Sequence, residues 1–323
     1  MEFGLAPDQS KPDFSDMQRQ AAMAEVLGFK TLWTHEHHSN AMMYPDPLMA
    51  LAALAPVTKT IRLGTSMLLL PIHHPVRVAQ EAAMLDVLSG GRVCLGLANG
   101  YSRGDLETFG VASSHRGRRL TEGVKLIRSL WSGDNVTADG EGFHLQDFEF
   151  FPLPVQAKGP PIYIGGHADV AIQRAAELGD NYFVSATAAF DMVGDLAKTY
   201  RGFMDKLGKP FAGILLNRVT CVVENAKQKA DAEEFYANAL IALYQNWGHA
   251  NVTQLTEEQR SVQHVARANC LIGEADEVHD RILEYEALGV GHIACLMNFG
   301  KPPTDVLERS IKLFGERIVP RFS

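Results

Sequence analysis

The chain has 323 residues, 46% of them hydrophobic and 21% charged, which is enough to bury a large core in one α/β barrel or in two ordinary domains. Its formal net charge of -8 gives no electrostatic attraction for nucleic acid or for an anionic membrane surface. The N-terminus lacks the pattern of a secretion signal, and no segment is apolar enough to span a membrane. We therefore expect a cytoplasmic protein with no nucleic-acid or membrane partner.

The first half of the chain alternates short apolar runs with amphipathic stretches, as repeated βα units do. The run at 61–70 is almost continuously apolar, as expected for a strand that is covered on both faces. The pattern predicts strands near residues 3, 32, 65 and 94. Apolar residues at helical spacing, some closed by a glycine such as Gly28, predict helices at 14–28, 47–57, 76–88 and 116–131.

The second half follows a predicted hairpin at 136–151 and the linker FPLPVQAKGPP, whose prolines exclude regular structure. Strands are predicted near 163, 182, 218 and 293, and helices at 168–178, 190–206, 275–288 and 304–316. Residues 225–268 are polar and too long for a simple connection, so we expect an inserted helical lid or interface element there. Eight strands with helices between them favour one (β/α)8 barrel domain over residues 1–323, and no G-x-G-x-x-G supports an open dinucleotide-binding sheet.

The four cysteines are far apart in the sequence, and each lies among apolar neighbours. No pair has the C-x-x-C spacing of a redox or metal motif. We expect reduced, buried side chains rather than disulfides or metal ligands. The cysteines are Cys94, Cys221, Cys270 and Cys295.

Polar residues that follow the strands are the candidates for chemistry, because the active site of such a barrel lies at the C-terminal ends of its strands. Six of the 12 histidines follow just three of the predicted strands, so their side chains should converge on one mouth. Within the first group, His35 and His37 should point to one side and Glu36 to the other. The six are His35, His37, His38, His73, His74 and His167.

A metal site is one interpretation of these histidines. The H-x-H spacing of His35 and His37 resembles that of metal-dependent barrel hydrolases. Further ligands are needed, however, and Asp46, Asp86 and Asp180 do not clearly follow a strand. We therefore expect no metal.

Flavin oxygenation is the second interpretation. A flavin hydroperoxide persists only where water is excluded and an imidazole can move a proton at neutral pH. The apolar residues 67–70, together with His37, His38 and His74, would meet both needs. Gly165-Gly166-His167 lies between a strand and a helix, where backbone N–H groups can hold a phosphate, although a glycine pair there also forms ordinary tight turns.

Several longer segments, in this order, carry a resemblance to a known family. They are GFKTLWTHEHH at 28–38, IRLGTSMLLLPIHHPVRVAQE at 61–81, LDVLSGGRVCLGLANGYSRGDLETFG at 85–110, PPIYIGG at 160–166 and KLFGERIVPRF at 312–322. Together they resemble the bacterial luciferase-like flavin monooxygenases over nearly the whole chain. The resemblance implies a (β/α)8 barrel, usually a homodimer, that binds reduced FMN supplied by a separate NAD(P)H-dependent flavin reductase.

The resemblance also implies roles for particular residues. Glu36 and His37 would be catalytic, with His37 as the proton-transfer residue beside the flavin C4a position, and His38 and His74 would line the same pocket. A non-proline cis peptide is expected at the bulge of the third strand, between Ser66 and Met67, facing the flavin. The remaining expected flavin contacts are Asn99, Tyr101, Arg103, Gly165, Gly166 and His167.

The chain departs from the light-emitting members where they bind the flavin phosphate. Asn99 stands in place of their arginine, which leaves Arg103 as a shifted substitute, and His167, Ala168 and Ala171 stand in place of acidic and hydroxyl residues. Phosphate contact would then rest mainly on backbone N–H groups. Ala98 replaces their reactive cysteine, so neither light emission nor a long-chain aldehyde substrate is expected.

The expected reaction is the oxidation of a small organic substrate by reduced FMN and dioxygen through a C4a-(hydro)peroxyflavin. Two alternatives stay open. One is a deazaflavin-dependent oxidoreductase of the same barrel class, which transfers hydride without oxygen. The other is a flavin-binding barrel without catalytic activity, against which the retention of Glu36, His37 and His74 argues.

Overall fold

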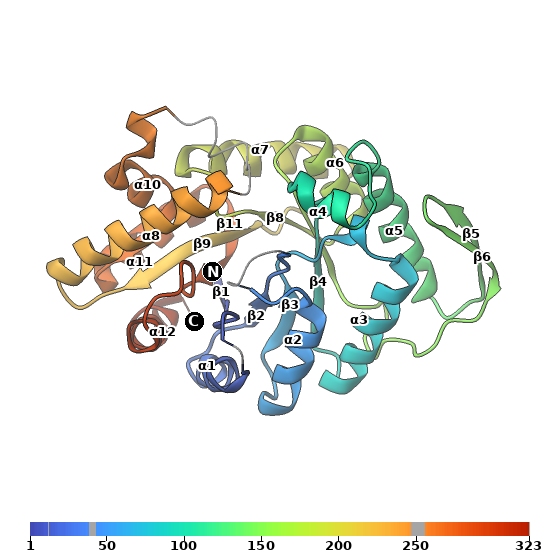
Figure 1. Ribbon diagram of the computed structural model, residues 1–323, viewed down its shortest axis with the longest axis horizontal. Helices are drawn as coiled ribbons and strands as arrows, with labels where there is room; N and C mark the ends of the chain where they lie inside the picture. The colour runs from blue at the N-terminus through green and yellow to red at the C-terminus, as the bar shows by residue number, and fades with distance from the viewer. Residues whose placement is uncertain (12, 39–42, 247–255, 323) are drawn as a thin grey trace. The chain divides into compact units, whose positions relative to one another are not determined.

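The computed structural model describes residues 1–11, 13–38, 43–246 and 256–322 (Figure 1). Within these residues the main sheet contains nine strands, and neighbours such as β1 and β11, β9 and β11, β4 and β7, and β8 and β9 run parallel. Neighbours follow the order β9, β11, β1, β2, β3, β4, β7, β8, and β8 pairs with β9 again. This closed order of eight strands is that of a (β/α)8 barrel, as the sequence predicts.

All eight predicted strands are present. Most are short and buried on both faces, which explains their nearly continuous apolar sequence. Their bounds are β1 Glu2–Leu5, β2 Thr31–Thr34, β3 Arg62–Thr65, β4 Val93–Leu97, β7 Ile162–Gly165, β8 Asn181–Val184, β9 Ile214–Val222 and β11 Val290–Leu296.

The chain divides into two compact units, one of Met1–Trp33 with Phe183–Ser323 and one of Thr34–Tyr182. In the second unit, helix α2 (Pro47–Leu54) begins where Asp46 accepts a hydrogen bond from the Met49 N–H and Pro47 occupies the first turn. The other helices of this unit are α3 (Pro75–Ser89), α4 (Arg103–Thr108), α5 (Arg116–Leu130) and α6 (Asp169–Leu178). The predicted hairpin is also present, as antiparallel strands β5 (Val136–Gly140) and β6 (Phe143–Phe148).

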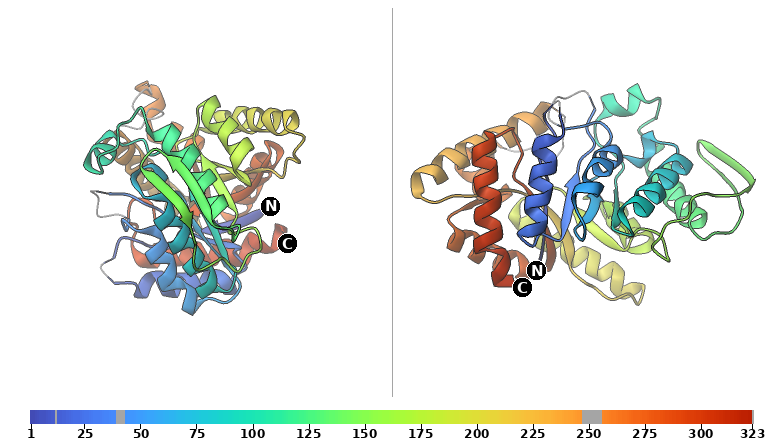
Figure 2. Two further views of the ribbon diagram at one scale, coloured as in Figure 1. Left: turned by 90° about the vertical axis from the view of Figure 1, so that its right-hand side faces the viewer. Right: turned by 90° about the horizontal axis from the view of Figure 1, so that it is seen from below.

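The first unit is built around aromatic side chains. Phe314 of α12 (Thr304–Arg317) packs edge-to-face on Phe3 with ring centroids 5.1 Å apart. Helices α1 (Ser15–Val26) and α12 lie side by side (Figure 2), joined by an ion pair of 2.6 Å between Arg19 and Glu308. The remaining helices of this unit are α7 (Phe190–Lys206), α8 (Ala226–Asn246), α10 (Val262–Asn269) and α11 (Ala275–Ala287).

The segment expected to be inserted is helical where it is described, in α8 and α10, and residues 247–255 of it lie outside the described residues. A short strand, β10 (Cys270–Gly273), follows α10 and was not predicted. It pairs with Val219–Val222, the end of the long strand β9, so its existence depends on a distant partner rather than on its own four residues. All four cysteines are buried and none forms a disulfide, as expected. No helix among the described residues has the length and apolar composition needed to cross a membrane.

Candidate functional site

All of the predicted site residues belong to the unit Thr34–Tyr182, where they follow strands β2, β3, β4 and β7. Strand β3 is shorter than the apolar run at 61–70 suggests. It ends at Thr65, although the Ser66 N–H still donates to the Thr34 carbonyl of β2 (2.7 Å) and the Leu68 N–H to the Gly96 carbonyl of β4 (2.8 Å). The peptide bond between Ser66 and Met67 is cis, which confirms the prediction made for it.

Glu36 is the centre of the site. Its side chain is completely buried, and its Oε1 atom accepts hydrogen bonds from His38 Nε2 at 2.7 Å and His73 Nε2 at 2.8 Å. Its Oε2 atom accepts the Leu69 backbone N–H at 2.7 Å. One carboxylate therefore connects the end of β2 with the segment that follows β3.

The charge state of Glu36 follows from these contacts. Burial disfavours its ionised form, but the hydrogen bonds from His38, His73 and the Leu69 N–H outweigh burial and hold the pKa of Glu36 below its ordinary value of 4.5. Burial also acts against the protonated form of His73, yet the hydrogen bond to Glu36 keeps the pKa of His73 above 6.5. The carboxylate is thus ionised at neutral pH and is hydrogen-bonded on both oxygens.

His35 and His37 have the opposite character. Burial lowers the pKa of His35 to about 3, with a smaller contribution from the nearby His37. Burial also lowers the pKa of His37 to about 4, although the Glu36 charge opposes it. Both rings are therefore neutral at pH 7. His35 Nε2 lies 3.3 Å from Ser66 Oγ, and the His37 ring meets Tyr101 edge-on with centroids 6.4 Å apart.

The end of β4 supplies a polar turn. Gly100 has φ +70°, and its carbonyl accepts a hydrogen bond from Arg116 Nη1 at 3.0 Å. The Oδ1 atom of Asn99 is buried and has no hydrogen-bond partner among the described residues, so it is available to a donor such as a flavin ring N–H. Arg103, in contrast, is largely exposed at the start of α4 and pairs with Glu107 at 2.7 Å.

The turn after β7 is closely packed and requires a glycine. Gly166 has φ +147°, and a Cβ atom added there would lie 2.6 Å from the Ala171 side chain. The Gly166 carbonyl accepts a hydrogen bond from the Tyr182 hydroxyl at 2.6 Å. Helix α6 begins directly afterwards at Asp169. Bare backbone before a helix N-terminus suits an anionic group, and the half-buried His167 lies in the same turn.

The two histidines after β3 differ in position. The structure brings His73 to Glu36, whereas His74, the one expected to be catalytic, lies exposed at the N-cap of α3. The reason is the 3-10 turn Leu70–Ile72, which sets the direction of each side chain. Sequence reasoning noted His73 only as one of the strand-end histidines. The contact between His73 and Glu36 could not be predicted from a local sequence pattern, because the two residues are 37 positions apart.

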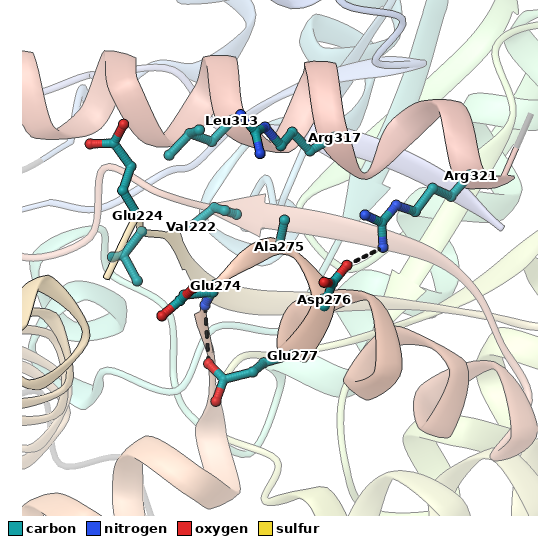
Figure 3. Close-up of a pocket in the computed structure, with 10 residues that line it drawn as sticks. Val222, Glu224, Glu274, Ala275, Asp276, Glu277, Leu313, Arg317 and Arg321 are labelled. Carbon is teal, nitrogen blue, oxygen red and sulfur yellow. Dashed lines mark hydrogen bonds and ion pairs between the residues drawn. The ribbon is translucent and has the colours of Figure 1, made fainter. Parts of the chain in front are cut away.

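A cavity of about 520 Å³ lies in the other unit and contains none of the predicted site residues (Figure 3). It is lined by the end of β9, the start of α11 and the end of α12. Its charged side chains include Glu274, Glu277 and Arg317, and Arg321 pairs with Asp276 at 2.7 Å. Acidic and basic groups are mixed there, which gives no preference for a flavin or its phosphate.

The fold is a (β/α)8 barrel in which histidine side chains, a buried carboxylate and glycine turns follow the strands. This arrangement is typical of barrel enzymes, whose active site lies at the C-terminal ends of the strands. The chain belongs to the luciferase-like monooxygenase family, whose sequence profile matches residues 1–292. The resemblance stated from the sequence is thereby confirmed, and the chain is a member of an oxidoreductase family.

Curated relatives cover almost the whole chain. The oxygenase component of the flavin-dependent trigonelline monooxygenase of Acinetobacter baylyi is 29% identical, over 96% of this chain and 90% of that protein. The 4-hydroxyprotoasukamycin monooxygenase of Streptomyces nodosus is 28% identical, over 99% and 90%. The F420-dependent glucose-6-phosphate dehydrogenase of Amycolatopsis mediterranei is 25% identical, over 95% and 94%. Relatives thus include both flavin-dependent and F420-dependent enzymes.

Solved structures share the fold. The monooxygenase RslO1 from Streptomyces bottropensis superposes with a TM-score of 0.85 at 23% identity and covers 100% of both chains. The oxygenating constituent of 3,6-diketocamphane monooxygenase from Pseudomonas putida, in complex with FMN, superposes with a TM-score of 0.81 at 19% identity, over 99% of this chain and 98% of that one. Both agree with the barrel assigned from the strand order.

Proposed function

We propose that this chain is the oxygenase component of a two-component flavin monooxygenase. It would bind reduced FMN and use dioxygen to place one oxygen atom on a small organic substrate, while the other oxygen leaves as water. The observation that carries the proposal is the position of His37 at the end of β2, where its half-buried ring meets Tyr101 and follows the buried carboxylate of Glu36. Burial lowers the pKa of His37 to about 4, so the neutral ring can accept a proton from a reacting group and then return it.

The strand-end residues have separate roles in this proposal. Ser66 and Met67 would face the flavin ring, and Asn99 and Tyr101 would contact its polar edge from the end of β4. Gly165, Gly166 and His167 would hold the phosphate through backbone N–H groups. Arg103 could approach the phosphate only by leaving its ion pair with Glu107. When bound, reduced FMN supplies the two electrons with which dioxygen is activated.

His37 would move the proton, and His38, which is hydrogen-bonded to Glu36, would line the same pocket. Glu36 would act through its hydrogen bonds, since both of its oxygens are already occupied by protein donors. The apolar side chains of Leu68 and Leu70, both buried, would help to exclude water.

The proposed partners follow from the same assignment. A separate NAD(P)H-dependent reductase would supply the reduced FMN, as the words "oxygenase component" imply for the Acinetobacter relative. A cytoplasmic homodimer is proposed as well. It is supported by exposed apolar side chains on α3, where Met84 is 60% and Leu88 61% exposed. Light scattering of the purified protein tests the dimer.

Cofactor identity is the first thing to test, because F420-dependent relatives exist. The purified protein is mixed anaerobically with reduced FMN or with reduced F420, and dioxygen consumption is then followed on exposure to air. Protein-dependent consumption with FMN supports the monooxygenase. Anaerobic hydride transfer with F420 would refute it, and flavin binding without any turnover would favour a non-catalytic barrel.

The segment 225–268, which is described in α8 and α10, is proposed to act as a lid or as an interface element. Its motivation is that oxygen activation on a flavin needs protection from water. Hydrogen exchange of α8 and α10 measured with and without FMN tests the idea. Equal protection in both states would favour an interface role.

A further inference from the structure

We propose that His73 is a positioning residue of this site and the solvent-side end of a proton path that runs from His38 through the Glu36 carboxylate. This inference rests on the proposed function, because the path has a use only if the reaction moves protons. It assigns His73 a role that the family resemblance does not give it.

The geometry forms a continuous chain of hydrogen bonds. His38 Nε2 and His73 Nε2 bind the same carboxylate oxygen, at 2.7 and 2.8 Å. The Glu36 side chain, in the middle of the chain, is 0% exposed, whereas that of His38 is 15% and that of His73 31% exposed, so His73 is the more exposed of the two ends. His73 is therefore the group through which the buried carboxylate can exchange a proton with solvent.

Imidazole is suited to this position because it can take up a proton on one ring nitrogen and release one from the other. His73 is placed by two features of its segment. Leu70–Ile72 forms a 3-10 turn directly before it, and the Leu69 N–H is bound to the other oxygen of Glu36 at 2.7 Å. The carboxylate thus holds both ends of the short segment 69–73.

The charges around His73 favour its protonated form. Glu36 acts directly, and the more distant Glu81 and Asp46 act in the same sense. Glu81 is itself paired with Arg77 at 2.6 Å, which weakens its contribution.

The first test needs no cofactor. The protein is labelled with isotopically enriched histidine, and the imidazole signals are followed by NMR as the pH is changed. The signal of His73 is the one that is missing from the spectrum of His73→Gln. We expect His73 to titrate above its ordinary value of 6.5, and to move down in Glu36→Gln. Titration at the ordinary value in both proteins would overturn the positioning role. The exposed pair of His144 with Asp139 supplies a control, because its signal should not respond to Glu36→Gln.

The second test addresses the proton path. His73→Gln keeps an N–H donor for Glu36 but cannot pass a proton, so dioxygen consumption with reduced FMN should fall about tenfold, with a changed pH profile and unchanged flavin affinity. The rate of His73→Ala should fall by a similar factor and should recover when free imidazole is added. His144→Gln, the control, should keep the wild-type rate.

The outcomes separate the two proposals. A His73→Gln enzyme with the wild-type rate and pH profile would overturn the path, and so would the absence of imidazole rescue in His73→Ala. Free reduced FMN also reacts with dioxygen, so the rate without protein is subtracted; if the wild-type protein does not change that rate, the proposed function fails together with the path. The NMR titration still decides whether His73 is held by Glu36 and can act as a positioning residue.

Discussion

The buried His35 gives a quantitative prediction for stability in acid. Its side chain is 5% exposed, and burial lowers its pKa to about 3, so the ring stays neutral in the folded protein. In the unfolded chain the same ring has its ordinary value of 6.5. Because the folded-state pKa is the lower one, the unfolded state binds the proton first. The stability that His35 contributes is present above pH 6.5 and is lost as the pH falls from there towards 3.

The size of the effect follows from the two pKa values. A pH of 5 is about 1.5 units below the pKa of the ring in the unfolded chain, so that ring is protonated there. In the folded protein the ring is still neutral at this pH. At about 1.4 kcal/mol per unit, His35 alone should lower the free energy of unfolding by about 2 kcal/mol between pH 7 and pH 5. His37, with a pKa of about 4, should act in the same direction.

Urea unfolding followed by tryptophan fluorescence, at pH 7 and at pH 5, measures this loss. The control is His35→Gln, which cannot titrate but retains a polar side chain. All other groups titrate equally in both proteins, so the loss of stability should be about 2 kcal/mol smaller in the variant. If wild type and variant lose the same free energy within about 0.5 kcal/mol, the assignment of a neutral, buried His35 is wrong.

Three further predictions concern the same unit. His37→Ala should reduce turnover with reduced FMN at least about tenfold with the fold intact, as judged by circular dichroism, because a proton-transfer group is lost; an unaffected rate would remove His37 from the mechanism. Gly96→Ala should cost at least about 2 kcal/mol in urea unfolding, because the added Cβ atom would lie 2.1 Å from the Thr65 carbonyl oxygen; wild-type stability would show that the backbone at the end of β3 can move freely. Asp86→Ala should lower the free energy of unfolding by about 3 kcal/mol, because the buried carboxylate accepts hydrogen bonds from the Gln156 backbone N–H at 3.0 Å and from the Gln156 side-chain Nε2 at 2.7 Å. A loss below about 1 kcal/mol would mean that water takes the place of the carboxylate.

The sequence by itself determined the barrel and the neighbourhood of the site. Buried strands need continuous apolar runs, and helices need apolar residues at helical spacing, so the eight strands of the ring could be located from local pattern alone. The cluster His35–His38 follows β2 directly, and its place at a strand end is fixed by that strand. The cis bond after Ser66 was also predictable, although only through the family resemblance.

Tertiary structure decided which of these side chains meet. Glu36 binds His73 rather than the adjacent His74, and β10 exists because the end of β9 offers it a partner. The segment after β3 likewise takes its course from its neighbours, since the N–H groups of Ser66 and Leu68 donate to the Thr34 carbonyl of β2 and the Gly96 carbonyl of β4. The spacing of apolar residues in the sequence predicts which side of its own helix or strand a residue lies on. A hydrogen bond between residues 37 positions apart is instead chosen by the direction of a short turn and by the cost of leaving a buried carboxylate without donors.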